Sequence, residues 1–343
     1  MPTAFVHDPL YELHDAGRNH PERPDRIRAA LALLQEAPVF ADLVPLTARD
    51  ATREELALVH DAALIDLVRE ASRAGDSWLD PDTHAGTHSF DAAVRSAGGC
   101  LAAVDWVLDK AGRNAFALVR PPGHHATPTR AMGFCFFNNI AVAAAHALER
   151  RGLDRVAIVD LDVHHGNGTE DCFASDPRVL YVSTHQYPFY PGTGALEDTG
   201  LGEGRGSTIN VPLPAGSGDV AYCEAMAQIV TPALQRFGPQ LILVSVGFDA
   251  HFADPLAGMQ LSNAGYAHMV ASLCALSGEL CEGRIVFALE GGYDLDAVAW
   301  GVLNTCEALA GLEPSPDPLG PAPPAPEPDI ARLLQRAKAL HRL

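Results

Sequence analysis

The chain has 343 residues, of which 48% are hydrophobic, so it can bury a large core. Its 24 basic residues face 43 acidic ones, and the formal charge of -19 argues against nucleic-acid binding through a basic face. No apolar run approaches the length of a membrane span, and the N-terminus lacks the pattern of a secretory signal. Seven cysteines, an odd number without a CxxC pair, indicate reduced thiols and a cytoplasmic location.

The first third of the chain predicts one strand, a polar loop and several helices. Residues 3–7 form a short apolar run, and the prolines of HPERP disfavour regular structure in the following loop. Thr52 and Glu55 form a capping box that opens a helix. Apolar spacing predicts further helices over 25–36, 60–74 and 90–110, and the segment 79–89 is rich in turn-forming residues.

Strands and helices alternate in the rest of the chain. Strands are predicted over 115–119, 155–160, 178–184, 208–212, 240–246 and 284–289, and helices over 138–151, 220–237, 263–280 and 294–310. This order, with strands that lack polar alternation, predicts an α/β fold whose parallel sheet is covered by helices on both faces. We expect one main domain over 1–312, followed over 313–343 by a proline-rich strap and a short helix that packs on it or trails from it.

Reactive polar residues stand directly after four of the predicted strands. They are His124 and His125, the stretch DLDVHHGNG at 160–168, Asp249, and Tyr293. The carboxyl ends of parallel strands meet at one edge of a sheet, and active sites of such sheets form there. We therefore expect these side chains to lie close together.

The stretch DLDVHHGNG has the spacing of a metal site. Asp160, Asp162 and His164 are two residues apart, so an extended chain would turn all three to one face, while His165 would face away. Asp162, His164 and Asp249 offer two oxygen ligands and one nitrogen ligand, and three protein ligands are typical of a catalytic metal. The absence of thiolate suits zinc and also admits iron, manganese or cobalt. Taken alone, Asp249 is also explained as a helix N-cap.

The histidine pair and the tyrosine could supply acid–base chemistry. A Pro-Pro-Gly turn fixes the direction of His124 and His125, and each ring needs a partner that sets its tautomer. Asp160 and Asn167 are the candidates for these partners. Tyr293 follows two glycines and could donate a hydrogen bond to a developing oxyanion. Paired histidines and Gly-Gly-Tyr turns also occur as ordinary structure, but together these groups indicate metal-assisted amide hydrolysis.

Six motifs carry a family resemblance, in the order RPPGHH, GFCFFNN, DLDVHHGNG, YPGTG, GFDAHFADP and EGGY. They resemble the arginase/deacetylase superfamily, and more closely its zinc-dependent histone deacetylases of class II and the bacterial histone deacetylase-like amidohydrolases. The resemblance extends from HPERP to about residue 310. It implies a single α/β domain with an eight-stranded parallel sheet, and removal of acetyl or other acyl groups from acyl-lysine or a related N-acyl amine.

The resemblance also implies roles for individual residues. One catalytic Zn²⁺ would be bound by Asp162, His164 and Asp249. His125 would be the main general base and acid, His124 its electrostatic partner and Tyr293 the catalytic tyrosine, with Asp160 pairing with His124 and Asn167 matching class II. A structural K⁺ would be held by Asp160, Asp162, His164, Ser183 and Thr184, and a second monovalent ion near Phe173, Asp176, Val179 and Ser207.

For the substrate channel, the resemblance implies two aromatic walls, Phe134 and Tyr190. A slot between flat rings suits an uncharged methylene chain. Gly133 would line this slot, and Asp82 matches a rim aspartate that holds the substrate backbone. Leu256 stands where vertebrate polyamine deacetylases carry a glutamate, which favours acyl-lysine peptides or a small acylated amine over polyamines.

Three alternatives remain open. An acetylpolyamine amidohydrolase is not excluded, because bacterial enzymes of that kind use other acidic residues. A module that binds acyl-lysine without hydrolysing it is disfavoured by Tyr293. Arginase-type hydrolysis needs further aspartates for a two-metal bridge, where this chain has His165 and Asn167. We expect no nucleic-acid or membrane partner, and the sequence leaves a homo-oligomer open.

Overall fold

The computed structural model describes residues 2–343, and its centre is a sheet of eight strands in the order β2-β1-β5-β10-β9-β6-β7-β8. The strands are β1 (Thr3–Val6), β2 (Leu43–Leu46), β5 (Asn114–Ala117), β6 (Val156–Asp160), β7 (Val179–Gln186), β8 (Thr208–Leu213), β9 (Leu241–Val246) and β10 (Ile285–Leu289). Every pair of neighbours is parallel, which confirms the predicted fold class.

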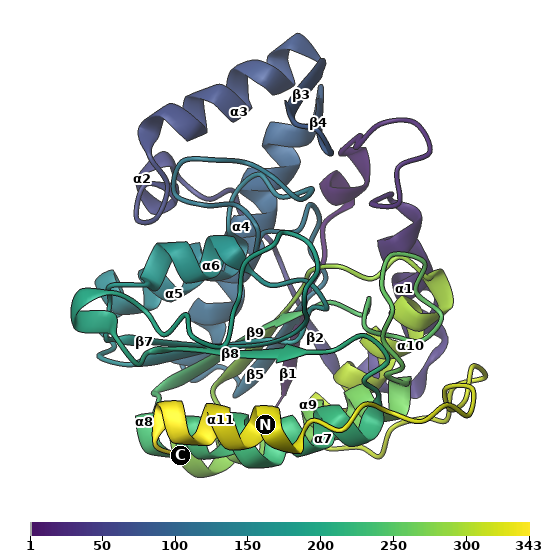
Figure 1. Ribbon diagram of the computed structural model, residues 1–343. Helices are drawn as coiled ribbons and strands as arrows, with labels where there is room; N and C mark the ends of the chain where they lie inside the picture. Colours follow the sequence, from purple (N-terminus) through teal and green to yellow (C-terminus); the bar gives the residue numbers. More distant parts are fainter. Residues whose placement is uncertain (1) are drawn as a thin grey trace.

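Helices cover both faces of this sheet (Figure 1). One layer contains α4 (Ser89–Leu108), α5 (Asn139–Glu149) and α6 (Asn167–Phe173), with α2 (Arg53–Leu56) and α3 (Ala62–Ala74) beyond it. The other contains α7 (Asp219–Ala225), α8 (Thr231–Phe237), α9 (Asn263–Cys281) and α11 (Ala331–His341), with α1 (Asp25–Glu36) and α10 (Leu295–Leu309) at one side. A π-helical turn, Met226–Val230, joins α7 to α8, and 3-10 turns span Pro9–Leu13, Pro38–Asp42 and Gly202–Gly204.

The structure contains four strands and helices that the sequence patterns did not indicate. Strand β2 is only four residues long and contains Pro45, which an edge strand tolerates because it needs no N–H on its open side. The turn-rich segment forms a small antiparallel hairpin from β3 (Asp76–Asp80) and β4 (Thr83–Gly86). Helix α6 begins at Asn167, inside the stretch whose glycines suggested only a turn.

The burial of the central strands explains why their sequences are apolar without interruption. All residues of β6, β9 and β10 are buried, because helices cover the sheet on both sides and other strands flank them in the sheet. Polar residues are therefore restricted to the points where these strands end. Strands β5, β10, β9 and β6 are direct neighbours, so the loops after them converge on the middle of one sheet edge.

The C-terminal strap and α11 lie against α7 and α8 (Figure 1). The Glu327 carboxylate accepts hydrogen bonds from three N–H groups at the start of α7, those of Gly218 (2.8 Å), Val220 (3.1 Å) and Ala221 (2.9 Å). A carboxylate at this position also interacts favourably with the positive end of the helix dipole. On α11, Leu334 is buried in the core. None of the helices formed by residues 2–343 combines the length and apolarity needed to cross a membrane.

We expect Leu334→Ala to lower the free energy of unfolding by about 2–4 kcal/mol, because the substitution leaves a cavity under α11. Leu340 on the same helix is 45% exposed, so Leu340→Ala should change the free energy by less than about 0.5 kcal/mol. Urea denaturation of the two variants measures the difference. Equal, small effects would show that α11 does not pack on the domain in solution.

Candidate active site

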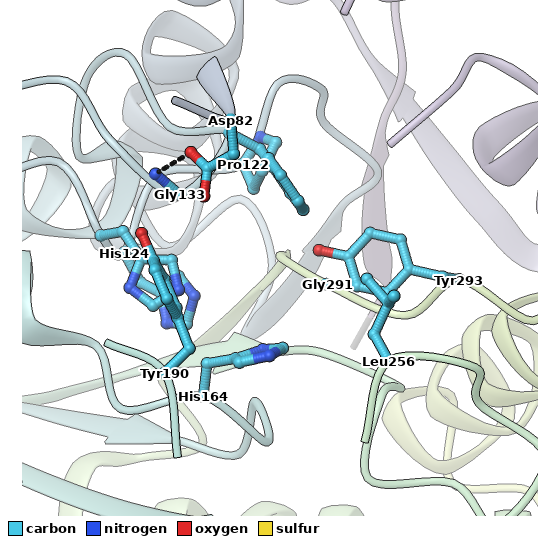
Figure 2. A pocket seen from close by; sticks show the side chains of 11 residues that line it. Asp82, Pro122, His124, Gly133, His164, Tyr190, Leu256, Gly291 and Tyr293 are labelled. Carbon is cyan, nitrogen blue, oxygen red and sulfur yellow. Dashed lines mark hydrogen bonds between the residues drawn. The ribbon is translucent and has the colours of Figure 1, made fainter. Parts of the chain in front are cut away.

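The residues predicted to react lie together at the ends of the four central strands. His124 and His125 follow β5, Asp162 and His164 follow β6, Asp249 follows β9, and Tyr293 follows β10. The side chains of His124, His125, His164 and Tyr293 line one pocket of about 90 Å³ (Figure 2). It is lined by Asp82, Pro122, His124, His125, Gly133, Phe134, His164, Tyr190, Leu256, Gly291 and Tyr293.

Asp162, His164 and Asp249 form a buried group whose ligand atoms all lie within 4.8 Å of one another. The Nδ1 atom of His164 is 3.2 Å from both Asp162 Oδ1 and Asp249 Oδ2. The contact between His164 and Asp249 Oδ2 does not have hydrogen-bond geometry, so this buried oxygen has no hydrogen-bond partner among the described residues. A buried carboxylate oxygen without a donor is unfavourable, and a cation would compensate it. The group therefore fits a divalent metal ion.

Backbone N–H groups orient the two aspartates of this group. Asp162 Oδ2 accepts a hydrogen bond from Gly291 N (2.8 Å), and Asp249 Oδ1 accepts one from Val163 N (2.9 Å). The loops approach so closely that a Cβ atom on Gly291 would lie 2.1 Å from Asp249 Oδ2. Glycine at this position therefore lets the β10 loop pass close to Asp249 and donate a hydrogen bond to Asp162.

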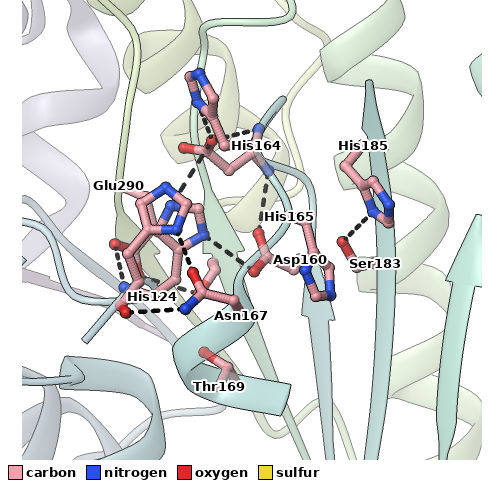
Figure 3. Close-up of polar contacts among 12 residues, drawn as sticks. His124, Asp160, His164, His165, Asn167, Thr169, Ser183, His185 and Glu290 are labelled. Carbon is pink, nitrogen blue, oxygen red and sulfur yellow. Dashed lines mark hydrogen bonds and ion pairs between the residues drawn. The ribbon is translucent and has the colours of Figure 1, made fainter. Parts of the chain in front are cut away.

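The two histidines have different partners. Nδ1 of His124 is 3.2 Å from the Asp160 carboxylate, and Nδ1 of His125 is 2.8 Å from Asn167 Oδ1 (Figure 3). Burial disfavours a charge on His124, but the carboxylates of Asp162 and Asp160 outweigh burial and raise its pKa to about 10. Burial and the positive charge of His124 hold the pKa of His125 well below its ordinary value. His124 is therefore the more basic ring of the pair.

Tyr293 lies across the pocket from this pair (Figure 2). Its ring packs edge-on against Phe134, with centroids 5.9 Å apart, and the Arg26 guanidinium lies 5.0 Å from its centroid. Burial raises the pKa of Tyr293 well above its ordinary value, although Arg26 opposes the shift. The phenol therefore keeps its proton and can donate a hydrogen bond.

The walls of the pocket are aromatic and narrow. Tyr190 packs edge-on against His125 at 5.1 Å, and Phe134 lies with Gly133 on another wall. Gly133 has φ +58°, and a Cβ atom there would lie 2.4 Å from the His125 ring, so this position favours glycine. At the mouth, Asp82 Oδ1 accepts a hydrogen bond from Gly133 N at 3.2 Å. The hairpin that carries Asp82 is thus tied to the channel wall.

Other residues singled out in the sequence lie outside the metal group. The His165 ring faces away from His164 and contacts Thr193 Oγ1 (2.8 Å) and Glu170 Oε2 (3.0 Å) (Figure 3). Asp160 of β6 and Ser183 of β7 are paired in register, and both are buried, as is Thr184. Phe173, Asp176 and Val179 share the turn between α6 and β7, and Ser207 O accepts a hydrogen bond from Tyr181 N in β7.

Two residues that support the site were missed in the sequence. Glu290 Oε2 accepts hydrogen bonds from the N–H groups of Gly123 (2.6 Å) and His124 (3.1 Å), so it fixes the histidine turn. Because Glu290 stands directly after a buried strand, its position in the sequence could have indicated a role in the site. Arg26 donates from α1 to the carbonyl oxygens of Glu290 (2.6 Å) and Gly292 (2.5 Å). No local pattern distinguishes Arg26 from a surface arginine, because its acceptors are more than 260 positions away.

Comparison with known proteins agrees with this geometry. The Histone deacetylase domain family matches residues 20–309. A histone deacetylase-like amidohydrolase of Pseudomonas aeruginosa is 42% identical over 328 residues, which cover 90% of this chain and 86% of that protein. The polyamine deacetylase HDAC10 of Homo sapiens is 41% identical over 318 residues, which cover 88% of this chain and 46% of that protein.

Solved structures show the same relationship. The crystal structure of the HDA15 HD domain matches with a TM-score of 0.90 and 38% sequence identity, covering 99% of this chain and 94% of that chain. The family match, the relatives and the shared fold all span nearly the whole chain. The chain therefore belongs to the histone deacetylase family.

Proposed function

We propose that the protein is a zinc-dependent deacylase, which hydrolyses the amide of acyl-lysine or a related N-acyl amine. One observation carries this proposal. His164, a member of the buried Asp-His-Asp group, lines the same pocket as the histidine pair and Tyr293. Metal ligands, a base and an oxyanion donor thus surround one small space.

Asp162, His164 and Asp249 would hold the zinc ion. Their oxygen and nitrogen donors suit zinc, and the unpartnered Asp249 Oδ2 supports a cation at this point. Bound zinc would act as a Lewis acid that lowers the pKa of water and polarises the amide carbonyl. The remaining chemistry can be derived from the protein's own residues.

His125 is suited to be the base, and later the acid. Asn167 Oδ1 accepts a hydrogen bond from His125 Nδ1–H, so the lone pair of this neutral ring is on Nε2. Nε2 can remove a proton from the attacking water and deliver it to the leaving amine. The charged His124 ring, held by Asp160, would stabilise negative charge that develops in the transition state.

The channel supports a substrate with a slender, uncharged stem. Phe134 and Tyr190 offer flat apolar surfaces, and Leu256 adds an aliphatic side chain to the lining. An acyl-lysine stem consists of methylenes and suits such walls. Asp82 at the mouth would accept hydrogen bonds from the substrate's backbone N–H groups. Asp82 already accepts hydrogen bonds on Oδ1, from Gly133 N and the Thr83 hydroxyl.

A structural K⁺ site at Asp160, Asp162, His164, Ser183 and Thr184 is a further part of this proposal. It is supported by the buried Asp160 carboxylate and Ser183 hydroxyl, which are register partners on β6 and β7. All seven cysteines are free, which supports a reducing compartment such as the cytoplasm.

Tyr293→Phe should retain zinc and bind substrate, but lower kcat by about two or more orders of magnitude, the scale for loss of one oxyanion donor. Steady-state kinetics on a fluorogenic acetyl-lysine peptide, together with metal analysis, measures both properties. Unchanged turnover would refute the catalytic role of the phenol.

Asp249→Ala should lose zinc and activity together, because only two ligands remain in the group. His165→Ala is the control, since this histidine is adjacent to His164 in sequence but faces away from the group. Metal content after dialysis, measured by mass spectrometry, separates the two variants. Stoichiometric zinc in Asp249→Ala would show that another ligand binds the metal.

Leu256→Glu should raise the rate on N-acetylputrescine relative to an acetyl-lysine peptide by about tenfold, because a carboxylate at the channel wall would pair with the free ammonium group of the polyamine. Leu256→Gln is the matched uncharged control. An assay in which the two substrates compete at about neutral pH measures the ratio of their kcat/KM values directly. An equal change in both variants would mean that side-chain size, rather than charge, sets the preference.

A further inference from the structure

We propose that Asp254 is a positioning residue, whose carboxylate holds the catalytic Tyr293 and the channel wall at Leu256 in fixed relation to each other. The inference rests on the function proposed above. It concerns a residue that neither belongs to the metal group nor lines the pocket, and that acts through the two loops it joins.

The Asp254 carboxylate is shared between these loops. Asp254 lies in the loop after β9 and is only 6% exposed. Its Oδ1 accepts a hydrogen bond from Leu256 N (2.9 Å) within the same loop. Its Oδ2 accepts hydrogen bonds from Tyr293 N (2.6 Å) and Asp294 N (3.3 Å) in the loop after β10. Oδ1 therefore binds the loop that carries Leu256, and Oδ2 binds the loop that carries Tyr293.

The first half of the β10 loop is bound by other groups. Glu290 N donates to Val246 O (2.9 Å), and Gly291 N donates to Asp162 Oδ2 (2.8 Å). The carbonyl oxygens of Glu290 and Gly292 accept hydrogen bonds from Arg26. This half of the loop is thus held independently of Asp254.

The second half depends on Asp254. Among residues 2–343, Asp254 is the one acceptor for the N–H groups of both Tyr293 and Asp294. Gly292, just before them, has φ +108°, and a glycine has no side chain that could hold the following residues in place. Loss of the carboxylate would therefore let the tyrosine backbone move, while the metal group keeps its own contacts.

Asp254→Asn tests this idea without a change in size. An amide offers one oxygen and one NH₂ group, so one of the two loops would face a donor where it needs an acceptor. We expect kcat to fall by about 10- to 100-fold, the scale for a displacement of about 1 Å in a catalytic group, while zinc content stays stoichiometric. Assays at pH 8 keep Asp254 ionised, since burial and the nearby charge of Asp249 raise its pKa to about 7.

A double-mutant cycle shows whether Asp254 acts through the tyrosine. In the Tyr293→Phe background, Asp254→Asn should lower kcat by less than about threefold further, because the group that it positions is already absent. If the two losses multiply instead, Asp254 acts elsewhere and the proposal is wrong. Loss of zinc in Asp254→Asn would also overturn it.

Asp294→Asn is the matched control. Asp294 is the neighbouring aspartate and caps α10 by accepting a hydrogen bond from Ala297 N (2.9 Å), and Asn serves equally well at an N-cap. This variant should keep wild-type kcat and an unchanged melting temperature. A loss equal to that of Asp254→Asn would show that any change in this loop impairs the enzyme.

A readout without turnover separates this proposal from the proposed function. The chain has seven tyrosines, so ¹⁹F NMR of 3-fluorotyrosine-labelled protein can resolve Tyr293, assigned by its disappearance in Tyr293→Phe. Asp254→Asn should shift or broaden that resonance, whereas Asp294→Asn should not. An unmoved resonance would refute the positioning role even if the enzyme is active. A shifted resonance in a chain that hydrolyses no acyl amine would refute only the proposed function.

Discussion

Buried negative charge is the constraint on which the rest of this structure depends. Asp160, Asp162, Asp249 and Glu290 are each no more than 1% exposed, and all lie at the ends of adjacent strands. Isolated buried carboxylates are very unfavourable, so the fold must supply donors and cations around them. Backbone N–H groups of the strand-end loops provide part of this compensation, and the His124 ring lies next to Asp160 and Asp162.

This need for compensation explains the composition of the loops. Backbone N–H groups reach the carboxylates only where the chains approach closely, which is why Gly291 stands next to Asp162 and Asp249. It also explains the asymmetry of the histidine pair. The carboxylates beside His124 raise the pKa of that ring, whereas burial lowers the pKa of the adjacent His125 ring, which is paired with the neutral Asn167.

The sequence predicted those parts of the structure that depend on local patterns. Unbroken apolar runs located β6, β9 and β10, and the polar residues directly after them gave most of the site. Strand β2 could not be predicted because its four residues contain a proline and are only partly buried. Long-range partners also escaped prediction. Arg26 and Asp254 each make two hydrogen bonds to the β10 loop from distant segments, and residue spacing along the chain does not indicate such contacts.

The place of β10 in the sheet has a consequence for assembly. Although it is the last strand in sequence, β10 is inserted between β5 and β9, and so joins β2-β1-β5 to β9-β6-β7-β8. All three members of the metal group belong to the second set of strands, while the histidine pair belongs to the first. The Asp-His-Asp group and the histidine pair are therefore brought to the same sheet edge through β10, which lies between the two sets of strands. Tyr293 follows the same strand, so the last strand of the chain completes the candidate site.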